Sequence, residues 1–442
     1  MKHKHGFCAT NQNARGIAFL LTVLCGMVFL IGEARCTAQN WPEFRGPEGK
    51  GTANCPSFPV TELKQHIRWE VELEGKAWSS PVIWDDQVWV TNATEDGVRM
   101  WVSCFDLASG KRLHHQTLHE YQKADLDFCH ETNSYASPTP VIEAGRIYTH
   151  FGRYGTSCLD TQTGEILWQR TDLECDHYRG PASSPILYGD LVIVAFDGAD
   201  QQYVVALSKQ TGETVWKTDR EIDYGTDVGD RMKSYGTGTI FRVDGKPLLV
   251  YPSAVATIAY EPSTGSPIWT VYHDGMNASA RPLQIPSGDL LISNGMGQMI
   301  AVNPVGTGNI TEQNIRWKLA KGVAKKSTPL VIGERIFMVS DQGIASCLDP
   351  ADGRVIWQSR LKGKFSSSPV FDGQSILIGS EEGVLYAFAA EEEFKLLGKT
   401  TFDSGFKATP ALVDGQLVLR SFYRLYCIDP PESDAKDNGQ NR

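Results

Sequence analysis

The sequence lacks the signatures of several catalytic and cofactor-binding classes. No Cys-x-x-Cys-His motif occurs, which excludes covalently attached haem. The sequence has no recognisable order of a Ser/His/Asp catalytic triad, no glycine-rich phosphate-binding loop and no metalloprotease helix motif. No motif therefore indicates a hydrolase. Helical periodicity is also nearly missing, whereas short runs of Val, Ile, Leu and Tyr are frequent. The chain is therefore expected to be all-β.

An excess of basic residues is absent as well. The 442 residues contain 42 Lys and Arg against 52 Asp and Glu, which gives a formal net charge of −10. No basic stripe dominates the sequence, and a protein of this charge has no general affinity for nucleic-acid backbones. We expect no nucleic-acid partner.

Only one long apolar run is present, at residues 16–32. Three basic residues precede it, and small residues ending at Ala38 follow it. This order predicts a signal peptide over residues 1–38. A retained anchor is the alternative, since about 17 apolar residues is the short limit for a span. No lipoprotein-type Cys follows a small residue, so we expect an exported, periplasmic or secreted protein without stable membrane insertion.

One phrase recurs along the remaining chain. An apolar strand ends in Asp or a substitute, a short polar stretch with Gly follows, and an aliphatic residue then precedes Trp, as in Leu159 to Trp168 and Leu348 to Trp357. A Gly at the turn tolerates a positive φ, and Asp or Thr bonds back to the backbone. The recurring Trp residues are predicted to be structural clamps between repeats. They are Trp69, Trp168, Trp216, Trp269, Trp317 and Trp357.

A Ser/Thr-Pro pair and two further strands follow each copy of that phrase. With two variants, at Arg281-Pro282 and at residues 236–238, eight units result. Their spacing of about 40 to 60 residues suits four short strands per unit. The fold class is thus an eight-bladed β-propeller of four-stranded blades. The expected divisions are an N-terminal extension at 39–66, the propeller at 67–430 and a disordered polar tail at 431–442.

The two ends of the repeat array complement each other. The last unit stops after three strands, and residues 67–71 supply an unattached strand that carries Trp69. We expect this N-terminal strand to pair into the last blade, which leaves no open sheet edge.

The seven cysteines outside the signal fall into two groups. Cys104, Cys158, Cys347 and Cys427 occupy one equivalent place in the repeat and are expected to be small core residues. Cys55, Cys129 and Cys175 lie outside that pattern, and the last two fall in neighbouring segments between blades. If a disulfide forms, we expect it to join these two.

These turns and strands resemble the PQQ-like propeller repeat superfamily over about residues 60–430. That superfamily includes quinoprotein alcohol dehydrogenases and the propeller lipoprotein of the bacterial outer-membrane assembly machine. The start at Trp41 to Gly46 is similar to that of exported bacterial propellers with no assigned activity. Members that use a quinone carry adjacent cysteines, which this chain lacks. The resemblance therefore implies the fold, with no cofactor expected and PQQ with calcium as the alternative.

The segments before the Ser/Thr-Pro pairs should meet around one mouth of the channel. Basic and aromatic residues gather in them, and converging cations concentrate anions. The alternative is that these are ordinary solvated loop residues. The candidate ligand-binding residues are Lys76, Trp78, His130, Glu131, Asn133, Tyr135, Arg179, Lys233, Arg281, Lys326, Lys364 and Lys407.

The longest connection, residues 113–137, is rich in His, Asp and Cys. No spacing in it matches a zinc or calcium loop, so we expect a capping insertion and no metal site.

The sequence as a whole favours a monomeric, non-catalytic scaffold of cell-envelope assembly. Its channel mouth is expected to bind a protein, an anionic carbohydrate or an anionic small molecule. A PQQ- or sugar-dependent oxidoreductase using the central pocket and a polysaccharide-binding propeller are the alternatives.

Overall fold

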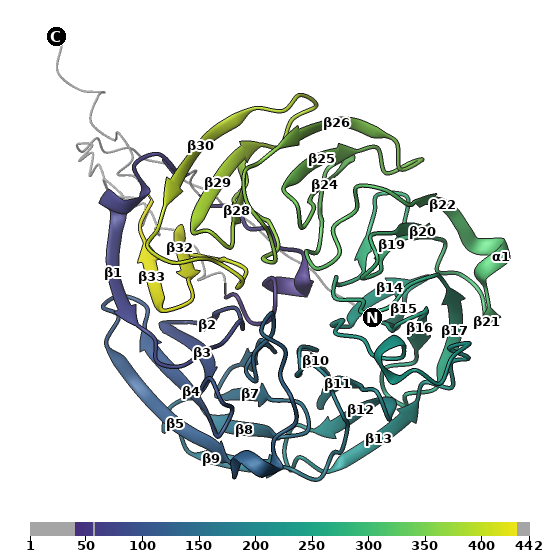
Figure 1. Ribbon diagram of the computed structural model, residues 1–442, viewed down its shortest axis with the longest axis horizontal. Coiled ribbons are helices and arrows are strands. Elements are labelled where there is room, and N and C mark those ends of the chain that lie inside the picture. The colour runs from purple at the N-terminus through teal and green to yellow at the C-terminus, as the bar shows by residue number, and fades with distance from the viewer. Residues whose placement is uncertain (1–39, 56–57, 431–442) are drawn as a thin grey trace, which may run out of the picture. The chain divides into compact units, whose positions relative to one another are not determined.

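The computed structural model describes residues 40–55 and 58–430, and these belong to one compact unit. Eight antiparallel sheets follow one another around a ring, as the eight-bladed prediction requires (Figure 1). The predicted signal peptide and polar tail lie outside the described residues.

Four blades form the first half of the ring. Blade 1 contains β2 (Val82–Trp84), β3 (Gln87–Ala93), β4 (Arg99–Asp106) and β5 (Arg112–Glu120). Blade 2 contains β6 (Val141–Glu143), β7 (Arg146–His150), β8 (Thr156–Asp160) and β9 (Ile166–Arg170). Blade 3 contains β10 (Ile186–Tyr188), β11 (Leu191–Asp197), β12 (Gln202–Ser208) and β13 (Thr214–Asp219). Blade 4 contains β14 (Thr239–Val243), β15 (Lys246–Pro252), β16 (Ala256–Tyr260) and β17 (Pro267–Tyr272), with the short β21 (Gly308–Asn309) parallel to β17.

Four blades complete the ring. Blade 5 contains β18 (Leu283–Gln284), β19 (Leu290–Ser293), β20 (Met299–Val302) and β22 (Ile315–Leu319). Blade 6 contains β23 (Leu330–Ile332), β24 (Arg335–Val339), β25 (Ile344–Leu348) and β26 (Val355–Arg360). Blade 7 contains β27 (Val370–Phe371), β28 (Ser375–Gly379), β29 (Val384–Ala389) and β30 (Leu396–Thr401). Blade 8 contains β31 (Ala411–Val413), β32 (Gln416–Arg420), β33 (Arg424–Ile428) and β1 (Ile67–Glu72).

The described helices are short. α1 (Thr311–Asn314) has four residues, and single 3-10 turns occupy Pro47–Gly49, Leu63–His66, Lys123–Asp125 and Gly229–Arg231. Within residues 40–55 and 58–430, no helix has the length and apolar character needed to cross a membrane.

The ring closes through the N-terminal strand. β1 pairs antiparallel with β33, and Trp69 lies opposite Cys427. This pairing confirms the closure predicted from the incomplete last repeat. The outermost strand of blade 8 therefore comes from the N-terminal part of the chain, and β33 is not left as an unpaired edge.

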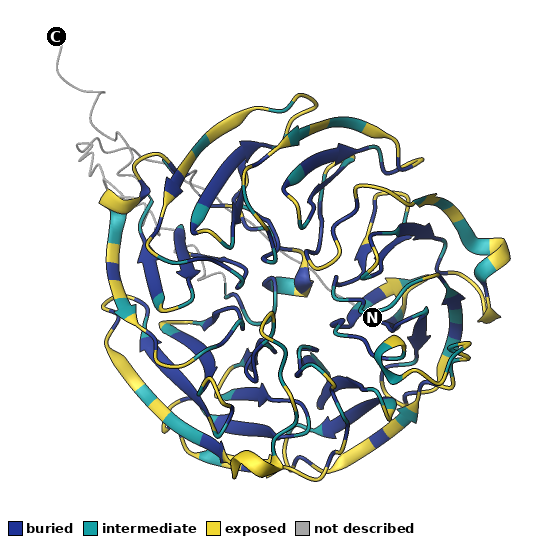
Figure 2. Ribbon diagram, in the orientation of Figure 1, coloured by how far each residue is buried: buried dark blue, intermediate teal, exposed yellow. Residues whose placement is uncertain are grey.

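The packing between blades is built around the repeated Trp. Each of the six indoles donates its N–H at 2.8 to 3.1 Å to a carbonyl in the turn before the last strand of the next blade. A Cys or Ala lies opposite each Trp on the third strand, and Cys158 and Cys347 are two of these small residues. Small residues leave room for the indole, so apolar clusters form between adjacent blades. Figure 2 shows these inner strands buried and the outermost strands partly exposed.

Candidate functional site

A ring of hydrogen bonds surrounds the channel where the inner strands begin. We call its members the hydroxyl ring. The backbone N–H of six of its seven members donates to the hydroxyl of the member in the next blade, at 2.9 to 3.1 Å. The members are Ser80, Thr139, Ser184, Thr237, Thr328, Ser368 and Thr409. Six of them precede a proline, which favours the extended backbone that this arrangement needs.

The eighth position of this ring is Arg281. Its backbone N–H donates to Thr328 at 2.9 Å, but its side chain has no hydroxyl with which to continue the ring. The guanidinium instead pairs with Glu43 at 2.8 Å and donates to the Phe44 carbonyl at 2.9 Å. Arg281 is 3% exposed and lines a separate cavity, so its predicted place at the mouth is wrong. The reason is that the N-terminal segment occupies the channel axis beside it.

We call residues 41–55 the axial segment. Trp41 exchanges two backbone hydrogen bonds with Ile83 of blade 1, and Ala53 donates to Phe371 of blade 7. Between these ends the segment crosses the middle of the ring, where Figure 1 shows it in purple. The predicted N-terminal extension therefore contributes a stretch that fills part of the channel.

Arg45 anchors the axial segment. Its guanidinium is completely buried and donates to five carbonyls, two in its own segment and three in blades 6 and 7. Burial, with a smaller contribution from Arg281, lowers the Arg45 pKa to about 9. The backbone passes close to other groups here. A Cβ on Gly46 would lie 2.5 Å from the Trp41 ring, and Gly46 has a φ of 71°.

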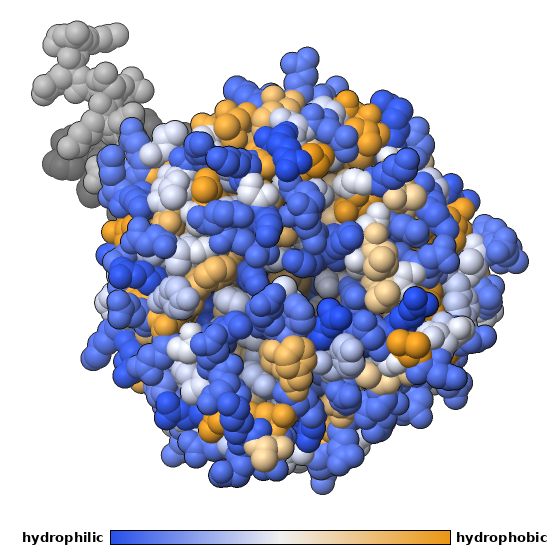
Figure 3. Space-filling model, viewed as in Figure 1, coloured by the Kyte–Doolittle hydropathy of each residue, from blue (hydrophilic) through white to orange (hydrophobic). Residues whose placement is uncertain are grey.

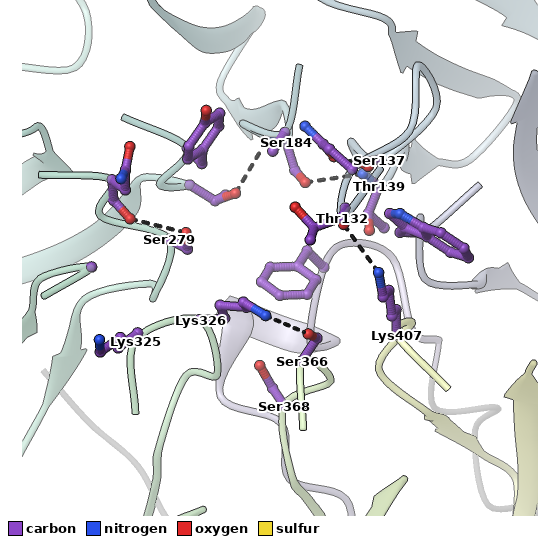
Figure 4. A pocket seen from close by; sticks show the side chains of 18 of the residues that line it. Thr132, Ser137, Thr139, Ser184, Ser279, Lys325, Lys326, Ser366, Ser368 and Lys407 are labelled. Carbon is purple, nitrogen blue, oxygen red and sulfur yellow. Dashed lines mark hydrogen bonds between the residues drawn. The ribbon is translucent and has the colours of Figure 1, made fainter. Parts of the chain in front are cut away.

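One side of the axial segment forms the floor of a cavity of about 340 Å³, which we call the mouth pocket (Figure 4). Phe44 lines it, together with six hydroxyl-ring members, all except Thr328. Its charged lining residues are Arg179, Lys233, Lys325, Lys326, Lys407 and Asp341. Cations thus outnumber the single carboxylate, although the whole chain is acidic.

Two lysines line the mouth pocket from different loops. The Lys407 ammonium donates to the Thr132 carbonyl at 3.1 Å and lies 4.6 Å from the centre of the Trp78 ring. Burial lowers the Lys407 pKa. The Lys326 ammonium donates to the Ser366 hydroxyl at 3.1 Å, and its nearest carboxylates are 3.8 and 3.9 Å away. Figure 4 shows both contacts.

Lys233 is held in the wall instead. Its side chain is fully buried, donates to the Asn277 side-chain oxygen at 2.7 Å and pairs with Asp230. The centres of the Tyr178 and Tyr235 rings each lie 5.4 Å from the ammonium nitrogen. Burial lowers the Lys233 pKa. Asp230 also lies 3.6 Å from the Arg179 guanidinium, so this one carboxylate balances part of the charge of two cations.

The structure gathers half of the predicted mouth residues into one pocket. Trp78, Asn133, Arg179, Lys233, Lys326 and Lys407 all line it. Lys76 and Glu131 line an adjoining hollow that shares Trp78 and Lys407, and His130 lies in another hollow with Arg179. Tyr135 is buried, with its hydroxyl donating to the Asp127 carbonyl, and Lys364 is exposed.

The sequence prediction missed the hydroxyl ring and Phe44 as lining residues. The repeated Ser/Thr-Pro pairs carried the information about the ring, because their hydroxyl lies at the same point of six blades. Phe44 belongs to the Trp41 to Gly46 motif, but nothing in that motif shows that it enters the channel.

The predicted disulfide between Cys129 and Cys175 is not formed. Both are free thiols. The Cys129 sulfur lies 3.7 Å from the Arg179 carbonyl, and the Cys175 sulfur lies 3.8 Å from the Gln201 carbonyl. Each sulfur is thus directed to a different backbone segment.

The donor set of the mouth pocket suits an anion better than a calcium-bridged quinone. Calcium takes six to eight oxygen ligands, commonly with several carboxylates. Asp341 is the one carboxylate that lines this pocket, and it accepts the Lys325 backbone N–H at 2.9 Å. In the described part of the chain, no three His, Cys, Asp or Glu side chains form a group that could hold a metal ion.

Comparisons with known proteins agree with this architecture. Outer membrane protein assembly factor BamB of Legionella pneumophila is 25% identical over 207 residues, which are 46% of this chain and half of that protein. The structure of BamB from Moraxella catarrhalis aligns with a TM-score of 0.59 at 13% identity, covering 83% of this chain and 98% of that one. A europium-containing methanol dehydrogenase aligns with a TM-score of 0.67 at 11% identity, covering 88% and 98%. At these identities the two structures show the fold alone.

A family model described as outer membrane protein assembly factor BamB matches residues 64–171, 102–359 and 200–434, which together span nearly the whole ring. The chain therefore belongs to this family of PQQ-like repeat propellers.

Proposed function

We propose that this protein is an exported, non-catalytic scaffold of the cell envelope, and that it binds a protein partner through the face that carries the mouth pocket. Relatives named as outer-membrane assembly factors support a role in assembly, although the chain spans only half of the Legionella protein's length. The exposed apolar side chains around the mouth carry the proposal.

Five large apolar residues are exposed in loops on this face. They are Phe128, Tyr178, Val228, Met296 and Tyr423, with exposed fractions between 42% and 68%. Aromatic residues and Met are enriched in protein interfaces. We call these five residues the apolar rim.

Four rim residues lie in connections between strands that also carry lining residues of the mouth pocket, and the fifth, Tyr423, lies in an adjoining hollow. Tyr178 precedes Arg179, Met296 follows Gly295, and Tyr423 shares a hollow with Trp78. Figure 3 shows one face of the ring, on which separate apolar groups stand among polar side chains. Such a surface suits a partner that touches several loops at once, with a polar centre and apolar contacts around it.

Site-specific photo-crosslinking in the host cell tests the proposal. A photoreactive phenylalanine at Tyr178, Met296 or Tyr423 should give crosslinks to a protein of the outer-membrane assembly apparatus, identified by mass spectrometry. Leu113 and Val215 are matched controls, since they are exposed apolar residues on the outermost strands β5 and β13. Crosslinking to the same protein from the controls, or none from the rim, would contradict the proposal.

The alternative function, a PQQ-dependent oxidoreductase, makes a different prediction. Calorimetric titration with PQQ and calcium would then show micromolar binding that depends on the mouth pocket. The scaffold predicts no heat of binding and no thermal shift under the same conditions.

A further inference from the structure

We infer that the mouth pocket is an oxyanion site that receives the carboxylate side chains of an acidic segment in the protein partner. The inference rests on the proposed scaffold function and names the chemistry of its central contact. Three observations carry it: hydroxyl hydrogens without acceptors, an excess of cations, and a closed floor.

The hydroxyl ring presents hydrogen-bond donors to the pocket. Each ring hydroxyl accepts a backbone N–H from the neighbouring blade, so its oxygen is engaged. Among the described residues, however, none of these hydroxyls donates its own hydrogen to a protein acceptor. A hydroxyl offers one donor in addition to its lone pairs. Six ring members line the pocket, so several O–H donors converge from different blades on one small volume.

The lining of the mouth pocket is rich in basic side chains, whose positive charge is complementary to a carboxylate. Lys325, Lys326 and Lys407 line the pocket. Arg179 and the buried Lys233 line it as well, and these two cations share one carboxylate, Asp230, as their counter-ion. Hydrogen bonds from such donors to a carboxylate are charge-assisted and stronger than neutral ones. The Lys407 ammonium donates to a single neutral oxygen and so retains hydrogens for an acidic group. The Lys326 ammonium donates to the Ser366 hydroxyl and has its nearest carboxylates at 3.8 and 3.9 Å, beyond hydrogen-bond distance.

The floor limits how far a ligand can enter. Phe44 closes the pocket toward the axial segment, which is fixed by the five carbonyl contacts of Arg45. A volume of about 340 Å³ accommodates a few side chains but no polypeptide passing through the ring. The geometry therefore fits the tips of acidic side chains that project from a segment lying across the mouth.

The apolar rim favours a protein over a free organic acid as the source of the carboxylates. A small acid would fill the pocket and leave Phe128 and Tyr423 in water, where they are 68% and 63% exposed. A polypeptide covers these rings while its acidic residues enter the centre. Apolar burial and charge pairing then act on the same partner.

Fluorescence anisotropy with a labelled, end-blocked octaglutamate peptide tests the inference on the purified protein. We expect saturable binding at low salt, no binding of octaglutamine, and about tenfold weaker octaglutamate binding to Thr409→Val and to Lys326→Gln, the loss typical of one charge-assisted hydrogen bond.

Thr328→Val is the matched control for Thr409→Val. Both threonines precede a proline and accept one ring N–H, at 2.9 and 3.0 Å, but only Thr409 lines the mouth pocket. Lys399→Gln removes an exposed lysine on β30 and controls for net charge. Both controls should bind octaglutamate within twofold of the unmodified protein.

Equal loss of binding in Thr409→Val and Thr328→Val would overturn the inference, because ring damage and not the pocket would then explain it. Binding of digalacturonate but not of octaglutamate would also overturn it, in favour of a free sugar acid. If octaglutamate fails to bind while rim crosslinks to the partner persist, this inference is wrong and the scaffold proposal stands. If octaglutamate binds as expected and the rim gives no crosslinks, the scaffold proposal fails.

Discussion

The backbone N–H of Thr409 donates a 3.0 Å hydrogen bond to the Ser80 hydroxyl, and this bond joins the last blade to the first across 329 residues. Arg420 reinforces the same junction by donating to the Ser79 hydroxyl at 2.7 Å. At the outer edge, β1 pairs with β33 and makes the second closure. The first and last blades are therefore joined both beside the channel and at the outer edge of the ring. These contacts connect residues that lie more than 300 positions apart in the sequence, so they close the longest loops of the chain.

Replacement of Ser80 by alanine should weaken this junction. The Thr409 N–H is buried and would lose its acceptor, so we expect the free energy of unfolding in urea to fall by about 1–3 kcal/mol. Ser287→Ala is the control, because Ser287 is exposed and bonds only within its own turn. That control should stay within about 0.5 kcal/mol of the unmodified protein. Equal effects of the two changes would show that the ring bond contributes nothing.

The glycine of the repeated Thr-Gly turn should be required by the Trp of the preceding blade. Gly265 has a φ of 71°, and a Cβ there would lie 2.4 Å from the Trp216 ring. Gly245 has a φ of 77° and open space around it, so Gly245→Ala bears only the backbone strain of about 1–2 kcal/mol. Gly265→Ala should cost about 1–3 kcal/mol more, because the Cβ overpacks the blade interface. Thermal or urea unfolding of the two variants measures this difference.

The sequence was sufficient to predict the repeat, the number of blades and the closure by the N-terminal strand. Each depends on local patterns, such as the turn before Trp168, that recur in most blades. The mouth was only half predicted. Arg281 occupies the position of a Ser/Thr-Pro pair, but its side chain is oriented by the ion pair with Glu43, which lies 238 residues earlier in the chain. Contacts between an extended segment and a channel leave no periodic pattern, so neither the axial segment nor its Phe44 floor could be foreseen.

Removal of the Arg45 guanidinium should release the axial segment. Arg45→Met leaves buried carbonyls of Thr328, Pro329 and Pro369 without their donor, so we expect a loss of at least about 3 kcal/mol in unfolding free energy. The Gly51 amide, which donates to the Arg45 carbonyl at 2.8 Å, should lose hydrogen-exchange protection.

Arg68→Met is the control for Arg45→Met, because Arg68 pairs with Asp429 on the surface. It should cost no more than about 1 kcal/mol and leave the exchange of the axial segment unchanged. Rapid exchange of that segment in the unmodified protein would contradict its role as a fixed floor.

Three buried histidines between blades 1, 2 and 3 should make the ring sensitive to mild acid. Burial lowers the pKa of His119 to about 4. Burial, together with repulsion from the other two histidines, lowers the pKa of His150 to about 3. Burial lowers the pKa of His177 to about 4, against a weaker opposing effect of Asp127. All three are therefore neutral in the folded protein at neutral pH.

Because each folded pKa lies below the unfolded value of about 6.5, the unfolded chain binds more protons between pH 6.5 and about pH 3 to 4. The stabilisation is fully present above pH 6.5 and is lost as the pH falls through this window. We expect the thermal midpoint to change little above pH 7 and to fall by several degrees toward pH 4. His150→Asn keeps a polar group near Thr156 Oγ1, which lies 2.8 Å from His150 Nδ1, but cannot titrate, so its midpoint should depend less steeply on pH. His66→Asn, at a half-exposed position before β1, should keep the original slope. An unchanged slope in His150→Asn would mean that other groups govern the response to acid.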